Sequence, residues 1–212
     1  MTKADNTKQP KKINNKSTAA EEIHFYRSNE KPYGVFSNLH RTLVVFEGRE
    51  YPTAEHAYQA GKASKEAVRE WILSAPTPSL VAMAAHGLYT WDIVPTWSKI
   101  KFDRMLNVLR AKFSQHENLR KLLLETGEAR LVEAGTTNNA VNRVWGEVNG
   151  KGQNMLGVLL MKVRDELRKE ELAQKKATTR PQRKATTKLQ PKAPTKPRRK
   201  ASATARSIVA AV

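Results

Sequence analysis

The 212-residue chain contains no cysteine, which excludes disulfide bonds and metal sites built on thiolates. No apolar run approaches the roughly 20 residues that a membrane-spanning helix needs. The N-terminal segment has no apolar core, so it does not resemble a secretory signal. We therefore expect an intracellular protein without a membrane partner, which is cytoplasmic, or nuclear if the host is eukaryotic.

Acidic residues are absent from the C-terminal end of the chain. Residues 175–212 contain twelve Lys or Arg and no acid, and residues 1–20 contain five Lys and one Asp. The net charge of +18 therefore belongs mainly to the two ends, because residues 21–174 hold 21 basic and 19 acidic residues. This division predicts one domain over 21–174, flanked by a basic segment at 1–20 and a basic tail at 175–212.

Large apolar residues are almost absent from the tail before Ile208, and the sequence Lys-Ala-Thr-Thr occurs twice. Such a segment cannot bury enough surface to offset its ordering entropy, so we predict disorder at both ends. Its cations suit non-specific contact with the phosphates of DNA or RNA. Lys196-Pro-Arg-Arg-Lys200 also resembles a nuclear import signal. A tail that only improves solubility is the alternative.

Hydrophobic periodicity predicts a mostly helical α+β domain with a small sheet. A short strand is expected at Ile23–Tyr26, and a hairpin at Leu43–Tyr51 with its turn near Glu47-Gly48. Helices are expected at about 53–62, 64–74, 78–87, 97–113 and 116–125, and from Asn154 towards 174. The Gly- and Asn-rich segment 135–153 is expected to be a loop.

Polar residues interrupt the predicted helix that follows Pro52. Glu55, Gln59 and Lys62 are spaced at i, i+4 and i+7, so they share one face of the helix. The other residues of this helix, including three alanines and Tyr58, suit burial. A buried polar stripe is costly unless its groups are satisfied or used, so it is either a packing salt bridge or one wall of a site. His56, beside the stripe, either caps the helix or packs in it.

Two loop segments are also rich in hydrogen-bonding groups and glycine. In Tyr33-Gly-Val-Phe-Ser-Asn38, Ser37 and Asn38 either bind a ligand or cap their own turn. Asn142-Arg-Val-Trp-Gly146 and Asn149–Asn154 either approach a ligand through their backbone or form a flexible loop. Glu133 interrupts a short apolar run, which is unusual for a carboxylate. The five histidines have no metal-ligand spacing, so we expect neither a metal nor a cofactor.

In combination these residues resemble the NADAR family over about residues 23–168. The motifs that carry the resemblance are Phe25-Tyr26, Tyr33-Gly-x-Phe-Ser-Asn38, Tyr51-Pro-Thr-Ala-Glu-His-x-Tyr-Gln-Ala-x-Lys62, Trp97, Met105, Ala111-Lys-Phe113, Leu122-Leu-x-x-Thr-Gly127, Leu131-Val-Glu133, Trp145-Gly146 and Gly152-x-Asn-x-Leu-Gly-x-Leu-Leu-Met161. The resemblance implies an N-glycosidase fold and site. The implied substrates are ADP-ribosylated guanine or a phosphoribosylamino-pyrimidine of riboflavin synthesis.

The resemblance also implies which residues form the site. The expected catalytic residues are Glu55, Lys62, Trp97 and Asn142. The expected substrate-binding residues are Tyr33, Phe36, Ser37, Asn38, His56, Gln59, Glu133, Trp145, Gly146 and Asn154. Cleavage of a ribosyl C–N bond passes through an oxocarbenium-like centre, which a carboxylate such as Glu55 can stabilise. Lys62 would pair with Glu55, bind phosphate or act as a nucleophilic amine.

The chain departs from the family at one position of the expected site. Family members typically have an acidic residue shortly before the Trp-Gly pair, whereas this chain has no carboxylate between Glu133 and Glu147. If Asn142 occupies that position, it can bind a hydroxyl group or water but cannot act as a base. Either Glu133 or Glu147 then supplies the second carboxylate, or the protein binds ADP-ribose without turnover and attaches to nucleic acid.

Overall fold

The computed structural model describes residues 21–179 and confirms an α+β fold in which helices predominate. The helices are α1 (Ala54–Ala60), α2 (Glu66–Leu73), α3 (Pro78–His86), α4 (Trp97–Gln115), α5 (Glu117–Glu125), α6 (Ala140–Trp145) and α7 (Met155–Thr179), with the 3-10 helices η1 (Tyr33–Phe36) and η2 (Thr90–Asp92). The strands are β1 (Glu22–Phe25), β2 (Val44–Phe46), β3 (Arg49–Tyr51) and β4 (Arg130–Glu133).

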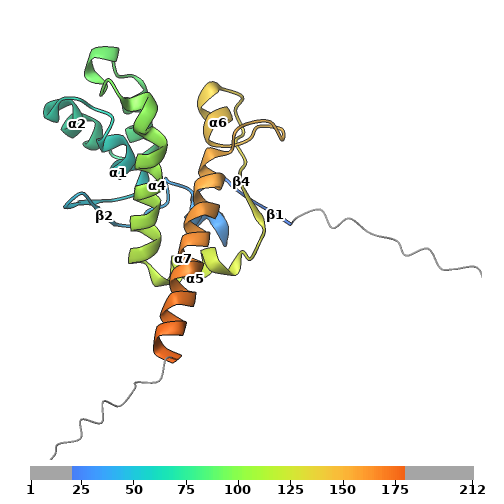
Figure 1. Cartoon of the computed structure of the whole chain (residues 1–212). Helices are drawn as coiled ribbons and strands as arrows, with labels where there is room; N and C mark the ends of the chain where they lie inside the picture. Colours follow the sequence, from blue (N-terminus) through green and yellow to red (C-terminus); the bar gives the residue numbers. More distant parts are fainter. Residues whose placement is uncertain (1–20, 180–212) are drawn as a thin grey trace, which may run out of the picture.

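Helices α4 and α7 lie side by side at the centre of the fold (Figure 1). The α1–α2 region and the hairpin lie on the α4 side, whereas β1, β4 and α6 lie on the α7 side (Figure 1). The main core forms where these layers meet, around Phe36, Phe113 and Leu160, which are all fully buried. Burial of such side chains typically contributes about 1.5–3 kcal/mol each.

The hairpin forms as the sequence predicts, with β2 antiparallel to β3. Glu47 and Gly48 form its turn with φ of 51° and 76°, and this pair of positive values is typical of the tight turns that match strand twist. The N-terminus of α1 is also as predicted, because the Thr53 side chain accepts a hydrogen bond of 3.3 Å from the His56 N–H.

The second sheet contains a strand that the sequence did not predict. Strand β4 pairs in parallel with β1, so that Ile23 lies opposite Leu131 and Phe25 opposite Glu133. Parallel strands end at the same edge of a sheet, and the residues that follow β1 therefore lie near the end of β4. This pairing brings together segments that lie more than a hundred residues apart in the sequence.

Two sequence predictions about the C-terminal half were wrong in detail. The segment 135–153 is not entirely a loop, because it contains α6, which begins where the Asn139 side chain accepts a 2.8 Å hydrogen bond from the Asn142 N–H. Helix α7 continues to Thr179, past the expected end at 174, because Ala, Gln and Lys favour helix even after packing ends. The remainder of the predicted tail and the segment 1–20 lie outside the described residues.

No helix within residues 21–179 is long and apolar enough to cross a bilayer.

Candidate active site

A cavity of about 460 Å³ opens where α1, α3 and α6 face the ends of β1 and β4. It contains seven of the site residues expected from the sequence. These are Ser37, Asn38, Glu55, Gln59, Glu133, Asn142 and Trp145. The volume suits a small-molecule ligand, and the mixed polar and aromatic lining is typical of such sites.

Helix α1 contributes two of the polar side chains in the cavity wall. Glu55 and Gln59 are one helical turn apart, and Gln59 Nε2 donates a 2.8 Å hydrogen bond to Glu55 Oε1. Both side chains are almost completely buried, with 8% and 2% of their surfaces exposed. Burial raises the pKa of the Glu55 carboxyl to about 7, against the lowering effects of the Gln59 hydrogen bond and the Lys62 charge.

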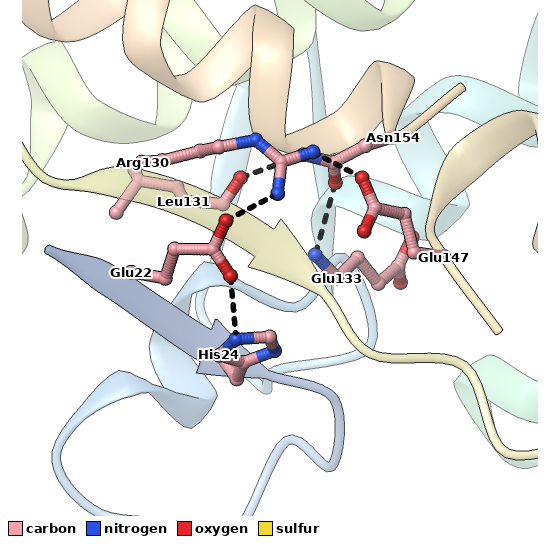
Figure 2. Close-up of polar contacts among 7 residues, drawn as sticks. All are labelled: Glu22, His24, Arg130, Leu131, Glu133, Glu147 and Asn154. Carbon is pink, nitrogen blue, oxygen red and sulfur yellow. Dashed lines mark hydrogen bonds and ion pairs between the residues drawn. The ribbon is translucent and has the colours of Figure 1, made fainter. Parts of the chain in front are cut away.

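Strand β4 delivers a second carboxyl group to the same cavity. Glu133 is the last residue of β4, and Asn154 holds its backbone in place from the start of α7 (Figure 2). Asn154 Oδ1 accepts a 3.0 Å hydrogen bond from the Glu133 N–H, and Asn154 Nδ2 donates one of 2.7 Å to the Leu131 carbonyl. This double contact fixes the end of the strand and with it the position of the Glu133 side chain.

The two carboxyl groups influence each other. Burial, followed by the negative charge of Glu55, raises the pKa of Glu133 to about 7. Two interacting carboxyls titrate as a pair, and the second proton is lost less readily than the first. Near neutral pH the pair therefore provides both a protonated acid and an ionised carboxylate, which is the combination that general acid–base chemistry requires.

Two buried carbonyl oxygens in the cavity wall have no hydrogen-bond partner among residues 21–179. They are Asn38 Oδ1 and Gln59 Oε1. Asn38 Nδ2 is directed towards Met105 Sδ at 3.3 Å, and Gln59 Nε2 is used by Glu55. An unpaired buried acceptor typically costs about 1–3 kcal/mol, so these oxygens favour a ligand that brings hydroxyl or N–H donors.

A second cavity of about 240 Å³ shares part of its wall with the first. Tyr58, Gln59 and Trp145 line both cavities, whereas Lys62 and Trp97 line only the second. The Tyr58 ring lies 5.1 Å from the Trp97 ring and 5.4 Å from the Trp145 ring, measured between centroids. These rings form an aromatic floor that extends from one cavity into the other.

The stripe Glu55–Gln59–Lys62 is thus divided between the two cavities. Lys62 Nζ donates a 2.6 Å hydrogen bond to the Ala85 carbonyl, and it forms no ion pair with Glu55 within residues 21–179. Burial lowers the pKa of the Lys62 amine, although the charge of Glu55 opposes this shift. The packing salt bridge considered from the sequence is absent in this part of the chain.

Asn142 lies in the wall of the main cavity on helix α6. Its Nδ2 donates a 2.7 Å hydrogen bond to the Thr137 carbonyl, which orients the amide. Glu147, the alternative source of a second carboxylate, does not line the cavity. It binds Arg130 instead, and Arg130 also contacts Glu22 (Figure 2). Of the two candidates, Glu133 lines the main cavity and Glu147 does not.

Five expected binding residues do not line either cavity. Phe36 is fully buried in the core, and Tyr33 stacks on it with a centroid distance of 5.6 Å. His56 Nδ1 lies 2.7 Å from Thr53 Oγ1, in the cap of α1. Gly146 packs against the Glu133 carbonyl, where a Cβ atom has no room. These residues and Asn154 support the walls because their side chains or backbone are used in packing and capping.

Several cavity residues were not predicted from the sequence. They include Arg27, Ser28 and Asn29 after β1, Tyr58 on α1 and His86 at the end of α3. Tyr58 was expected only to be buried, and no local pattern distinguishes the others. Within the described range, no group of three or more His, Cys, Asp or Glu could hold a metal ion.

Comparison with known proteins identifies relatives over the same region. The NADAR domain model matches residues 24–168. N-glycosidase YbiA of Shigella boydii is 40% identical over 146 residues, which cover 68% of this chain and 88% of that protein. Riboflavin biosynthesis protein VVA0006 of Vibrio vulnificus is 31% identical over 68% of this chain, although the match covers only 38% of that protein. The NMR structure of Escherichia coli YbiA superposes with a TM-score of 0.64 at 38% identity, covering 72% of this chain and 88% of that one.

Proposed function

The chain belongs to the NADAR domain family, and we propose that it is an N-glycosidase that hydrolyses the bond between a ribosyl group and a nitrogenous base. The proposed substrates are ADP-ribosylated guanine and a phosphoribosylamino-pyrimidine of riboflavin synthesis. The names of the relatives support the reaction class, and the name of the Vibrio protein supports the second substrate.

The observation that carries the proposal is the pair of carboxyl groups in one cavity. Glu55 and Glu133 come from different elements, face the same space, and both have a pKa raised to about 7. Buried carboxyls outside functional sites are normally paired with a cation. Here Glu55 accepts only an amide hydrogen bond, and Asn154 binds the backbone of Glu133 rather than its carboxyl.

Hydrolysis needs one group to donate a proton and another to stabilise positive charge. In the proposed reaction the ionised carboxylate stabilises the oxocarbenium-like C1′ as the C1′–N bond breaks. The protonated carboxyl transfers its proton to the departing base nitrogen. A water oxygen then bonds to C1′, and its released proton passes to a carboxylate, which restores the starting state. We assign the charge-stabilising role to Glu55 and the acid role to Glu133.

The remaining wall residues suit the two halves of such a substrate. Asn38 Oδ1 and Gln59 Oε1 can accept hydrogen bonds from ribose hydroxyls, which are donors of the required kind. Trp145 and Trp97 offer faces on which a base can stack. The Lys62 amine, whose pKa is lowered, lines the second cavity together with Trp97. With the nucleobase stacked there, Lys62 would orient or polarise it as the leaving group.

The alternative function, ADP-ribose binding without turnover, loses its main support. It depended on the missing acidic residue at Asn142, but Glu133 supplies a second carboxyl from another element. Non-specific contact with DNA or RNA remains a proposal for the basic ends, supported by the twelve cations of residues 175–212. Such contact is compatible with an enzyme that acts on a base-linked substrate.

The test is to incubate the full chain with guanine-linked ADP-ribose and with the phosphoribosylamino-pyrimidine, and to quantify the released base by mass spectrometry. We expect Glu55→Gln to lower the rate by about 10²- to 10⁴-fold, because the amide keeps the shape but not the charge. Glu50→Gln, on the exposed hairpin, is the matched control and should retain full activity. Equal background release by the wild type and Glu55→Gln would refute the enzymatic proposal.

A further inference from the structure

A third cavity, of about 300 Å³, borders the main cavity and shares no lining residue with the second one. The two share Ser28, Asn29, Leu39 and Ser79 in their walls, so they form one cleft. The extension also contains His40 and Arg41, and no acidic residue lines it. Nothing in the proposed hydrolysis uses this end of the cleft.

Two arginines that line the cleft differ from the other arginines of the described chain. Within residues 21–179, the guanidinium groups of Arg27 and Arg41 make no hydrogen bond or ion pair, whereas every other arginine does. Glu30 accepts a bond from the backbone N–H of Arg27 and not from its side chain. Arg27 lines the main cavity and Arg41 its extension.

The surroundings of these arginines favour an anion. Ser28 and Ser79 place hydroxyl donors in the shared wall, and Ser79 lies in the first turn of α3, where the helix dipole is positive. The positive charge of Arg41 also reaches the buried His56, whose pKa is held below its usual value by burial and then by Arg41. The carboxyls of Glu55 and Glu133 line only the main cavity, so the cleft has an acidic centre and a basic end.

We propose that Arg27 and Arg41 bind the phosphate of the substrate's ribosyl group, with the hydroxyls of Ser28 and Ser79 as further donors. The inference rests on the proposed function, because it assumes that the sugar lies between Glu55 and Glu133. A phosphate monoester and the diphosphate of an ADP-ribosyl group both present anionic oxygens that accept hydrogen bonds from guanidinium groups. The ligands of the test distinguish a phosphate monoester from a diphosphate.

The test measures binding first, so that it does not depend on turnover. Ribose, ribose 5-phosphate and ADP-ribose are titrated into the full chain by calorimetry at low and moderate salt. We expect binding of the two phosphorylated ligands but not of ribose, and a loss of about 10- to 100-fold in affinity for Arg41→Gln and for Arg27→Gln. The affinity should fall as salt rises, because both arginines are exposed to solvent.

Arg49→Gln is the matched control. Arg49 is also exposed, but it is paired with Glu70 on the hairpin side of the fold. The variant Arg49→Gln should leave the affinities for ribose, ribose 5-phosphate and ADP-ribose unchanged. Preference for ribose 5-phosphate indicates a monoester site, and preference for ADP-ribose indicates a diphosphate site. Equal binding of ribose and its phosphate, or unchanged affinity in both Arg27→Gln and Arg41→Gln, overturns the inference.

The two proposals fail in distinguishable ways. If the wild type binds phosphorylated ribose through these arginines but releases no base, the hydrolase proposal fails and the phosphate site stands. If the wild type releases base while Arg27→Gln and Arg41→Gln both retain its KM, the phosphate site fails and the hydrolase stands. In the expected case, Arg41→Gln raises KM about tenfold or more and changes kcat much less, because the arginine holds a part of the substrate that does not react.

Discussion

Burial brings the pKa of ionisable groups close to 7 in two neighbouring regions of this protein, with opposite consequences. In the cavity, it raises the pKa of the Glu55 and Glu133 carboxyls to about 7. Beneath the cavity, it lowers the pKa of the fully buried Lys112 amine to about 7. The carboxyls face open space, whereas Lys112 Nζ donates to the Val35 and Ser37 carbonyls at 2.5 and 3.1 Å.

The difference shows that a shifted pKa does not by itself mark a catalytic group. Lys112 has no exposed surface and its amine donates to two backbone carbonyls, so a ligand in the cavity cannot reach it. Its role is to hold the segment that ends in Ser37 and Asn38. The carboxyls retain unused acceptors beside a cavity, and this spare capacity indicates a site.

The largest effect is expected from Glu133→Gln, which removes one carboxyl from the cavity and leaves the other. Base release should fall by about 10²-fold or more, and one limb of the pH–rate profile should disappear, because only one titrating carboxyl remains. Steady-state rates measured from pH 5 to 9 provide the test. Glu147→Gln removes the nearby carboxylate outside the cavity and should cost less than about tenfold, since it touches no substrate. An unchanged pH profile in Glu133→Gln would remove Glu133 from the mechanism.

An effect of intermediate size is expected on the free energy of unfolding, to which Lys112 and Glu55 should contribute with opposite pH dependence. Lys112 has a pKa of about 7 when folded and the ordinary 10.5 when unfolded, so the unfolded state holds more protons between these values. Its contribution to the free energy of unfolding therefore rises with pH across that window. Glu55 has a pKa of about 7 when folded and the ordinary 4.5 when unfolded, so its contribution falls as pH rises from 4.5 to 7.

Urea unfolding of Lys112→Met and Glu55→Gln at pH 5, 7 and 9 measures the direction of both pH dependences. Lys112→Met should destabilise the protein by about 1–3 kcal/mol at pH 9, where it leaves two carbonyls unpaired, and by much less at pH 5, where it also removes a buried charge. Glu55→Gln should stabilise it by about 1–3 kcal/mol above pH 7 and have much less effect at pH 5. Shifts that do not vary with pH would contradict the buried-charge interpretation of both groups.

The smallest effect is expected from Asn142→Asp, which restores an acidic residue on α6. The new carboxylate loses the donor to the Thr137 carbonyl and should cost about 1 kcal/mol of stability. The value of kcat/KM should change less than about tenfold, because Glu133 already provides the second carboxyl. A gain in kcat/KM of more than a hundredfold would show that Glu133 does not suffice and that the cavity needs an acidic residue at position 142.

Local patterns predicted the parts of the fold that depend on neighbouring residues. The Thr53 cap, the turn at Glu47-Gly48 and the placement of Glu55 and Gln59 on one helix face follow from short-range geometry. The pairing of β1 with β4 was missed, because nothing local encodes a register between distant segments. Helix α6 was missed because glycines and asparagines on both sides obscured a short helical run.

The candidate site, like the fold, was predictable only where it depends on residues close together in the sequence. The carboxylate on α1 was identified from its helix, but the partnership of Glu133 with it depends on where β4 ends. The unpaired state of Arg27 and Arg41 has no sequence signature, since it depends on how the side chains around them are arranged in the folded chain. The burial of Lys112 was not predictable either. A lysine beside Phe113 in an amphipathic helix gives no sign in the sequence that it is fully buried.

The parallel pairing of β1 and β4 has a consequence for how substrate preference can change during evolution. Phe25 lies opposite Glu133, so Arg27 follows β1 only two residues beyond the level of the Glu133 carboxyl. In the proposed reaction, this register would set the separation between the reacting carbon and the bound anion. A slip of one residue would turn Glu133 to the opposite face of the sheet. Insertions or deletions in the turn after β1 would instead relocate Arg27 together with Ser28 and Asn29, and would leave Glu55 and Glu133 in place. Under the proposed function, a lineage could in this way exchange one phosphorylated substrate for another while the bond-breaking chemistry is inherited intact.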